Sequence, residues 1–164
     1  MTTLVTYNHI KKIKTINKVV DALLQEEQLI LPGGIMFCNK EIMIGPSCCC
    51  GLEDAQAIMQ AISDKKYPWL GHDPFPTIEY LQEGKVKVWS EDYSREKLGG
   101  KTKIYNIEYD YKSLMESLRR KEQDFINFIY GPLGEYLKEM KVLDYELVMQ
   151  KILKDFRGNY NVKL

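Results

Sequence analysis

The side chains of this chain that are best suited to act as nucleophiles, bases or metal ligands are its four cysteines and two histidines. Cys48, Cys49 and Cys50 are consecutive, and they stand between a Gly-Pro turn and a segment patterned like the start of a helix. Backbone N–H groups at the start of a helix stabilise a thiolate, which makes such a thiol a better nucleophile. Cys49 and Cys50 are therefore candidate nucleophiles, with His72 as a candidate base and Asp73 as its orienting group.

The block "CCCGL" at residues 48–52 resembles the "DCSGL" block of the NlpC-type cell-wall peptidases, whose cysteine begins a helix. The chain departs from that family because no aspartate precedes the cysteine and because His72 follows closely, on a proline-rich loop. We therefore assign no catalytic residue, and buried or inert thiols are the commoner state of free cysteine.

A tetrahedral zinc ion is the alternative use of these residues, with Cys38, Cys48, Cys50 and His72 as candidate ligands. Paired zinc cysteines normally stand two to four residues apart, so that both sulfurs face one ion. In an extended chain, neighbouring side chains point to opposite sides, so Cys48 and Cys50 would converge on one side. The spacing does not fit a standard zinc site, and we predict no cofactor.

The second unusual stretch is "YPWLGHDPFP" at residues 67–76, which combines prolines with aromatic residues. Stiff loops with aromatic side chains are common at protein interaction surfaces. An equally weighted alternative is that the rings fold under the loop while His72 and Asp73 cap a turn. The candidate binding residues are Tyr67, Trp69, His72, Asp73, Phe75 and Trp89.

Acidic residues are dense in the middle of the chain, where a shared face would attract a basic partner. Scattered solvated charges are the simpler alternative. The acidic residues of this middle segment are Glu53, Asp54, Asp64, Asp73, Glu79, Glu83, Glu91 and Asp92.

The composition is that of an ordinary globular protein, with 164 residues, of which 45% are hydrophobic and 28% charged. Basic and acidic residues balance at 23 each, which does not favour nucleic acid or an anionic membrane as a partner. No apolar run is long enough to span a bilayer, and the N-terminus lacks the pattern of a secretory signal. We expect one domain over residues 1–164, in a reducing cytosol where the thiols are not oxidised. The oligomeric state does not follow from the sequence.

Periodicity predicts the elements that position these residues. Apolar residues recur with helical spacing over 7–27, over 52–62 and from 112 onward, with a break expected at "GPLG", residues 131–134. Two hairpins are predicted over 34–45 and 77–90, and a fifth strand over 101–111. The expected fold is α+β, with a mainly antiparallel sheet of about five strands, an N-terminal helix, one short inserted helix and a C-terminal helical segment.

In combination, the blocks "GPSCCCGLED", "WLGHDPFP" and "VKVWS" resemble a widespread group of uncharacterised bacterial proteins that share G-P-x-C-C-C-G-L-E, W-L-G-H-D-P and V-x-V-W-S. The resemblance covers roughly residues 28 to 156, and Ala55 stands where we expect a tryptophan in that group. By size and element order the group is similar to the small immunity proteins that neutralise bacterial polymorphic toxins. The resemblance implies a non-enzymatic, cytosolic protein that binds another protein. The alternative function is a thiol-dependent site, zinc-binding or reactive, at Cys48 to Cys50 with His72.

Overall fold

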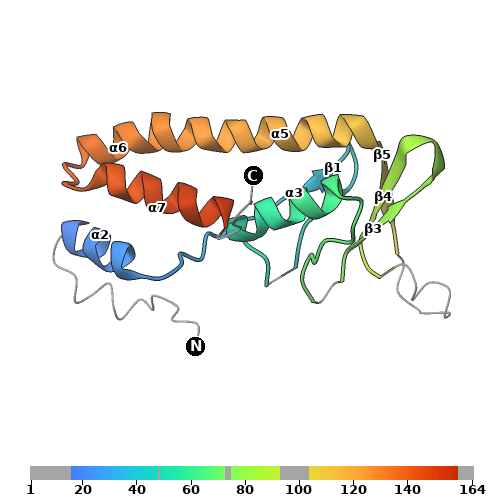
Figure 1. Ribbon diagram of the computed structural model, residues 1–164, viewed down its shortest axis with the longest axis horizontal. Helices are drawn as coiled ribbons and strands as arrows, with labels where there is room; N and C mark the ends of the chain where they lie inside the picture. Colours follow the sequence, from blue (N-terminus) through green and yellow to red (C-terminus); the bar gives the residue numbers. More distant parts are fainter. Residues whose placement is uncertain (1–15, 48, 73–74, 93–103, 159–164) are drawn as a thin grey trace. The chain divides into compact units, whose positions relative to one another are not determined.

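The computed structural model describes residues 16–47, 49–72, 75–92 and 104–158, in which helices and strands are mixed along the chain (Figure 1). The α+β prediction is confirmed. Two compact units are distinguished by their internal contacts: unit 1 comprises the residues up to Leu29 together with Asp124–Asp155, and unit 2 comprises Ile30–Gln123 and the residues from Phe156 onward. The expectation of a single domain over 1–164 stays a prediction.

Unit 2 contains a three-stranded antiparallel sheet in the order β3-β4-β5 (Figure 1). Strand β3 is Thr77–Tyr80, β4 is Lys85–Trp89 and β5 is Asn106–Asp110. The turn between β3 and β4 contains Glu83 at φ 59° and Gly84 at φ 72°, two consecutive left-handed residues. Such conformations match the twist of paired strands, and the predicted hairpin is confirmed. The fifth strand is present as β5, while residues 101–103 of its predicted range lie outside the described residues.

The first predicted hairpin is also present, with β1 at Phe37–Cys38 and β2 at Met43–Ile44. The Asn39 side-chain oxygen accepts hydrogen bonds from two backbone N–H groups inside the turn. The predicted single sheet of about five strands is wrong, because this hairpin forms a separate two-stranded sheet. Its strands are only two residues long, and the Cys38 carbonyl accepts a hydrogen bond at 3.0 Å from the side-chain hydroxyl of Tyr109 on β5.

Both sheets of unit 2 contribute to one hydrophobic core, which helices α3 (Ala55–Ser63) and the first turns of α5 (Tyr111–Phe128) complete. The short 3-10 helix η1 (Leu52–Asp54) leads directly into α3. Ala55, which stands where we expect a tryptophan in the group of proteins that this chain resembles, is buried. The buried residues of this core are Phe37, Ile44, Ile58, Met59, Ile62, Leu70, Ile78, Val86, Val88, Ile107, Leu114, Met115 and Leu118.

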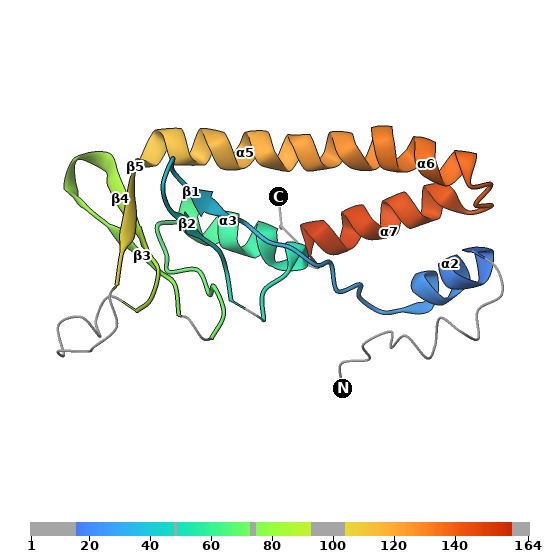
Figure 2. The ribbon, with the colours of Figure 1, turned by 180° about the vertical axis from the view of Figure 1, so that it is seen from behind.

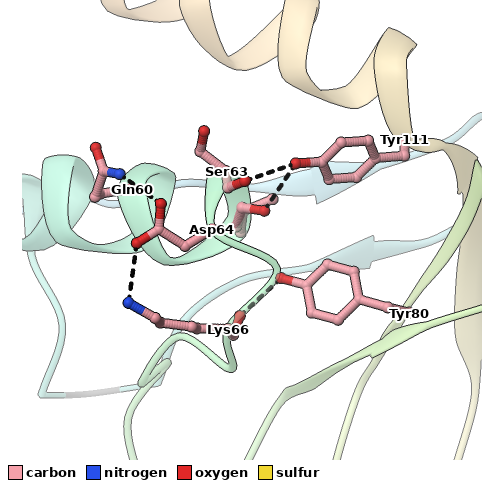
Figure 3. Close-up of polar contacts among 7 residues, drawn as sticks. Gln60, Ser63, Asp64, Lys66, Tyr80 and Tyr111 are labelled. Carbon is pink, nitrogen blue, oxygen red and sulfur yellow. Dashed lines mark hydrogen bonds and ion pairs between the residues drawn. The ribbon is translucent and has the colours of Figure 1, made fainter.

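Two tyrosine hydroxyls satisfy carbonyl groups at and just beyond the C-terminal end of α3 (Figure 3). The Tyr111 hydroxyl lies 3.1 Å from the Ile62 carbonyl oxygen and 3.0 Å from that of Ser63. The Tyr80 hydroxyl donates to the Lys66 carbonyl at 2.7 Å. Burial raises the pKa of Tyr80, and nearby tyrosines add to the rise, so its hydroxyl keeps the proton that it donates. These contacts join the end of α3 to β3 and α5.

Replacing Tyr111 by phenylalanine should lower the free energy of unfolding of unit 2 by about 1–2 kcal/mol, because the Ile62 and Ser63 carbonyls both lose the tyrosine donor. The Ile62 carbonyl keeps a hydrogen bond from the Lys65 N–H. Urea unfolding followed by tryptophan fluorescence measures this, since Trp69 and Trp89 both belong to unit 2. The control is Tyr67→Phe, which removes a hydroxyl from a largely exposed side chain and should change stability by less than about 0.5 kcal/mol. Equal effects of the two variants would contradict this role of Tyr111.

Unit 1 is helical in its described part, where α2 (Ile16–Gln25), α6 (Gly134–Glu139), α7 (Tyr145–Arg157) and the end of α5 meet. Helices α6 and α7 run antiparallel side by side (Figures 1 and 2). Helix α2 confirms the later part of the predicted helix over 7–27, whose earlier part lies outside the described residues. The buried residues of this second core are Val20, Ile129, Leu137, Val142, Val148 and Met149.

The predicted break at residues 131–134 is wrong, because the helix continues from α5 into α6 (Figure 2). A π-helical turn, η3 (Ile129–Leu133), contains Pro132 and widens the helix locally. Proline has no N–H to donate, and a π turn accommodates the resulting change in hydrogen bonding. Gly134 then allows close packing, because a Cβ there would lie 2.8 Å from Met149 Sδ. In this chain the glycine serves helix packing instead of ending a helix.

Candidate functional site

The two unusual stretches of the sequence come together in unit 2. We call residues 45–51 the cysteine turn and residues 67–76 the aromatic loop; Cys48, Asp73 and Pro74 lie outside the described residues. The Ser47 N–H donates to the Leu70 carbonyl at 2.8 Å. The Cys50 thiol donates to the Trp69 carbonyl at 3.8 Å. Backbone and side chain of the cysteine turn therefore both hold the aromatic loop.

The cysteine turn itself is closed by local hydrogen bonds. The Cys50 N–H donates to the Ser47 carbonyl at 3.1 Å, which bends the chain between them. The Gly51 N–H donates to the Asp54 carboxylate at 3.0 Å, a capping contact at the start of η1. The Glu53 carboxylate accepts the Leu31 N–H at 2.9 Å. Two residues of the expected acidic patch thus hold backbone groups in place.

Gly71 lies at the closest approach between the aromatic loop and the cysteine turn. Its φ is +102°, and a Cβ built there would lie 1.9 Å from the Ser47 hydroxyl oxygen. Ser47 is 8% exposed, and its hydroxyl is a buried polar group without a hydrogen-bond partner among the described residues. Glycine is required here by both its backbone conformation and the space.

The far end of the aromatic loop is held by the segment that follows β4. The Phe75 N–H donates to the Glu91 carboxylate at 3.1 Å, and the Thr77 hydroxyl donates to the Glu91 carbonyl at 3.1 Å. Pro76, between them, is buried. The loop is consequently fixed at both ends.

The aromatic side chains of this loop face solvent. Tyr67 is 69% exposed, Trp69 is 49% exposed and Phe75 is 37% exposed. Leu70, by contrast, is buried in the core of unit 2. The loop therefore directs its aliphatic residue inward and presents large aromatic side chains outward.

His72 contacts Cys49, which is the main chemical feature of the site. The imidazole Nδ1 lies 3.3 Å from the Cys49 sulfur, and both residues are exposed. The Trp69 ring packs edge-on against the imidazole, with ring centroids 5.5 Å apart. Among the nucleophile candidates, the structure thus places Cys49 beside the predicted base. Local patterns did not distinguish it from Cys50, because the contact joins two segments whose approach depends on the core.

The predicted zinc ligands are not gathered into a site in the part of the chain that the structure describes. There, no group of three or more His, Cys, Asp or Glu side chains is placed to hold a metal ion. Cys38 is exposed on β1, Cys50 directs its sulfur to the Trp69 carbonyl, and His72 contacts Cys49. Zinc remains the alternative that the sequence raised.

Trp89, the last predicted binding residue, lies at the end of β4 on the three-stranded sheet. Its indole N–H donates to the Glu79 carboxylate at 3.0 Å, and the Lys87 ammonium lies 5.7 Å from the ring centroid. Trp89 pairs with Thr77 in the β3–β4 register. Thr77 and Phe75 both donate hydrogen bonds to Glu91, Thr77 to its carbonyl and Phe75 to its carboxylate. The structure thus assigns Trp89 to the sheet beside the end of the aromatic loop.

No protein-family model matches the chain, and no curated protein or solved structure is similar enough to count as a match. Within the described residues, no helix is long and apolar enough to cross a membrane. The geometry of the site therefore carries the functional argument.

Proposed function

We propose that this protein acts by binding another protein through an aromatic surface formed by Tyr67, Trp69, His72 and Phe75. The observation that carries the proposal is the exposure of three large aromatic side chains on a loop that is hydrogen-bonded at both ends. Aromatic side chains are enriched among the residues that dominate binding energy. A fixed loop loses little conformational entropy when a partner binds, so more of the contact energy becomes affinity.

Two carboxylates that follow the cysteine turn support a partner with basic side chains. Glu53 and Asp54 follow the cysteine turn directly. Each carboxylate accepts a hydrogen bond from a backbone N–H group, and such a bond does not neutralise the carboxylate. A partner that combines an apolar side chain with lysine or arginine complements this surface.

We further place the protein in the cytosol, as a non-enzymatic immunity-type protein whose partner is a toxin domain encoded beside it. This role agrees with the resemblance of the "GPSCCCGLED" and "WLGHDPFP" blocks to the bacterial group described above. Both blocks contribute to the site, the first as the cysteine turn and the second as the aromatic loop.

Trp69→Ala should weaken binding to such a toxin domain by about 30-fold, the effect expected for a central aromatic contact. The experiment co-expresses the full chain with candidate toxin domains from neighbouring genes and measures cell survival, followed by titration calorimetry on the purified pair. The matched control is Tyr136→Ala, which removes an aromatic side chain of similar exposure from α6 in unit 1 and should change affinity less than about twofold.

Two results would overturn the proposal. If no neighbouring gene product binds the chain, the toxin-neutralising role is wrong. If a partner binds but Trp69→Ala and Tyr136→Ala weaken it equally, the aromatic surface is not the binding site.

A further inference from the structure

We propose that Cys49 is a reactive thiol whose proton passes to His72, and that low-molecular-weight disulfides modify it. This inference concerns the chemistry of the Cys49 sulfur and does not depend on the protein-binding proposal. It starts from the 3.3 Å distance between Cys49 Sγ and His72 Nδ1, which is short enough for a hydrogen bond to sulfur. Both groups are exposed, so a small molecule has access to the sulfur.

The surrounding contacts hold this pair in place. The Trp69 ring packs against the imidazole on one side of the contact. On the other, the Ser47 N–H to Leu70 carbonyl bond and the close approach of Gly71 to Ser47 fix the two segments against each other. His72 follows Gly71 directly, and Cys49 is two residues after Ser47. The contact between sulfur and imidazole is therefore a product of packed backbone, not of two mobile side chains alone.

The proposed reaction is thiol–disulfide exchange. In the tautomer with its proton on Nε2, His72 accepts the thiol proton of Cys49 at Nδ1. The thiolate attacks one sulfur of the small disulfide, whose S–S bond breaks as a new S–S bond to Cys49 forms. The other half leaves as a thiolate and takes the proton from His72. One disulfide bond is exchanged for another, so no further oxidant is consumed.

Disulfides fit this site better than acyl substrates do. Acyl transfer needs donors aimed at a developing oxyanion in addition to a nucleophile and a base. Exchange with a disulfide needs only a thiolate, access to it and a proton source for the leaving group. Cys50 is poorly suited to release the modifying group, because adjacent cysteines bridge only through a strained ring. The product is thus a mixed disulfide on Cys49 that an external thiol, instead of Cys50, reverses, which makes this a reversible modification site.

The test uses the full chain with Cys48→Ser and Cys50→Ser, which retains Cys49 and the exposed Cys38 of β1 as an internal comparison. Dithiobis(2-nitrobenzoate) measures exchange rates at pH 6, and mass spectrometry of peptides after oxidised glutathione locates the product. An ordinary thiol is only about 0.3% thiolate at pH 6. Cys49 should react about tenfold faster than Cys38. The increase in rate is smaller than the increase in the thiolate fraction, because a more stable thiolate is a weaker nucleophile.

His72→Gln in the same background should bring the Cys49 rate down to that of Cys38, while urea-unfolded protein should show equal rates for both thiols. A Cys49 to Cys38 rate ratio near one in the folded protein would overturn the proposal. So would a ratio that His72→Gln leaves unchanged, because the reactivity would then come from exposure alone. Neither result bears on whether Trp69 binds a partner, so the two proposals fail separately.

Discussion

Replacing Gly71 by alanine should destabilise unit 2 by about 3 kcal/mol, because two penalties add at this position. The backbone has φ +102°, a conformation that residues with a Cβ rarely adopt. The added Cβ would also lie 1.9 Å from the Ser47 hydroxyl oxygen and 2.9 Å from its Cβ, on a residue that is buried. Urea unfolding followed by the fluorescence of Trp69 and Trp89 measures the loss.

The matched control for Gly71 is Gly84, in the turn between β3 and β4. It also has a positive φ, +72°, but nothing lies within 4 Å of a Cβ built there. Gly84→Ala should therefore cost about 1 kcal/mol, the backbone penalty alone. Combining Gly71→Ala with Ser47→Gly removes the closest contact and should recover about half of the loss. Equal costs for the two glycine substitutions would show that packing against Ser47 is unimportant.

Gly71→Ala should also affect the chemistry of the site. The substitution pushes the aromatic loop away from the cysteine turn and so separates His72 from Cys49. Under conditions where the variant is still folded, we expect its Cys49 labelling rate to fall towards that of Cys38. An unchanged rate would mean that the Cys49 to His72 contact does not depend on this packing.

Asp155→Ala should lower the free energy of unfolding of unit 1 by about 3 kcal/mol, because it leaves a partly buried ammonium without its carboxylate. Asp155 is 5% exposed and lies 2.7 Å from Lys151 Nζ. It also accepts the Leu29 N–H at 2.9 Å, while Lys151 Nζ donates to the Glu27 carbonyl at 2.9 Å. The pair therefore ties the segment after α2 to the last turns of α7.

The helical signal in circular dichroism measures this loss, since unit 1 is helical where it is described and both tryptophans lie in unit 2. The matched control is Asp64→Ala, which breaks a Lys–Asp pair of similar length, 3.1 Å, on the surface of unit 2. Exposed pairs contribute little, so the control should cost much less than Asp155→Ala. Similar costs for Asp155→Ala and Asp64→Ala would contradict the importance of burial at Asp155.

The elements of the fold were largely predictable from the sequence. Asn39 and the Glu83–Gly84 pair indicated two hairpin turns, and both are present because turn conformation depends on a few adjacent residues. The pairing of these hairpins into sheets was not predictable from such signals. The two-residue strands β1 and β2 form a sheet of their own. Their buried residues belong to the same hydrophobic core as those of the three-stranded sheet.

Two glycines show where local rules were insufficient. Gly134, beside Pro132, suggested a helix break, yet it lies in a continuous helix and makes room for Met149. Gly71 lies in a loop where no local pattern requires glycine, yet it determines how closely that loop approaches Ser47. In each case the reason for glycine is a residue far away in the sequence, which no local pattern records.

The candidate site divides in the same way. Residue types and spacing alone indicated an α+β protein, a thiol-rich turn and an aromatic loop, because helix, strand and turn preferences act over a few residues. Only the tertiary structure decided that Cys49 contacts His72, that Tyr67 and Trp69 face solvent, and that the two stretches form one site. These contacts join segments that are distant in sequence, and they follow from how the core of unit 2 packs.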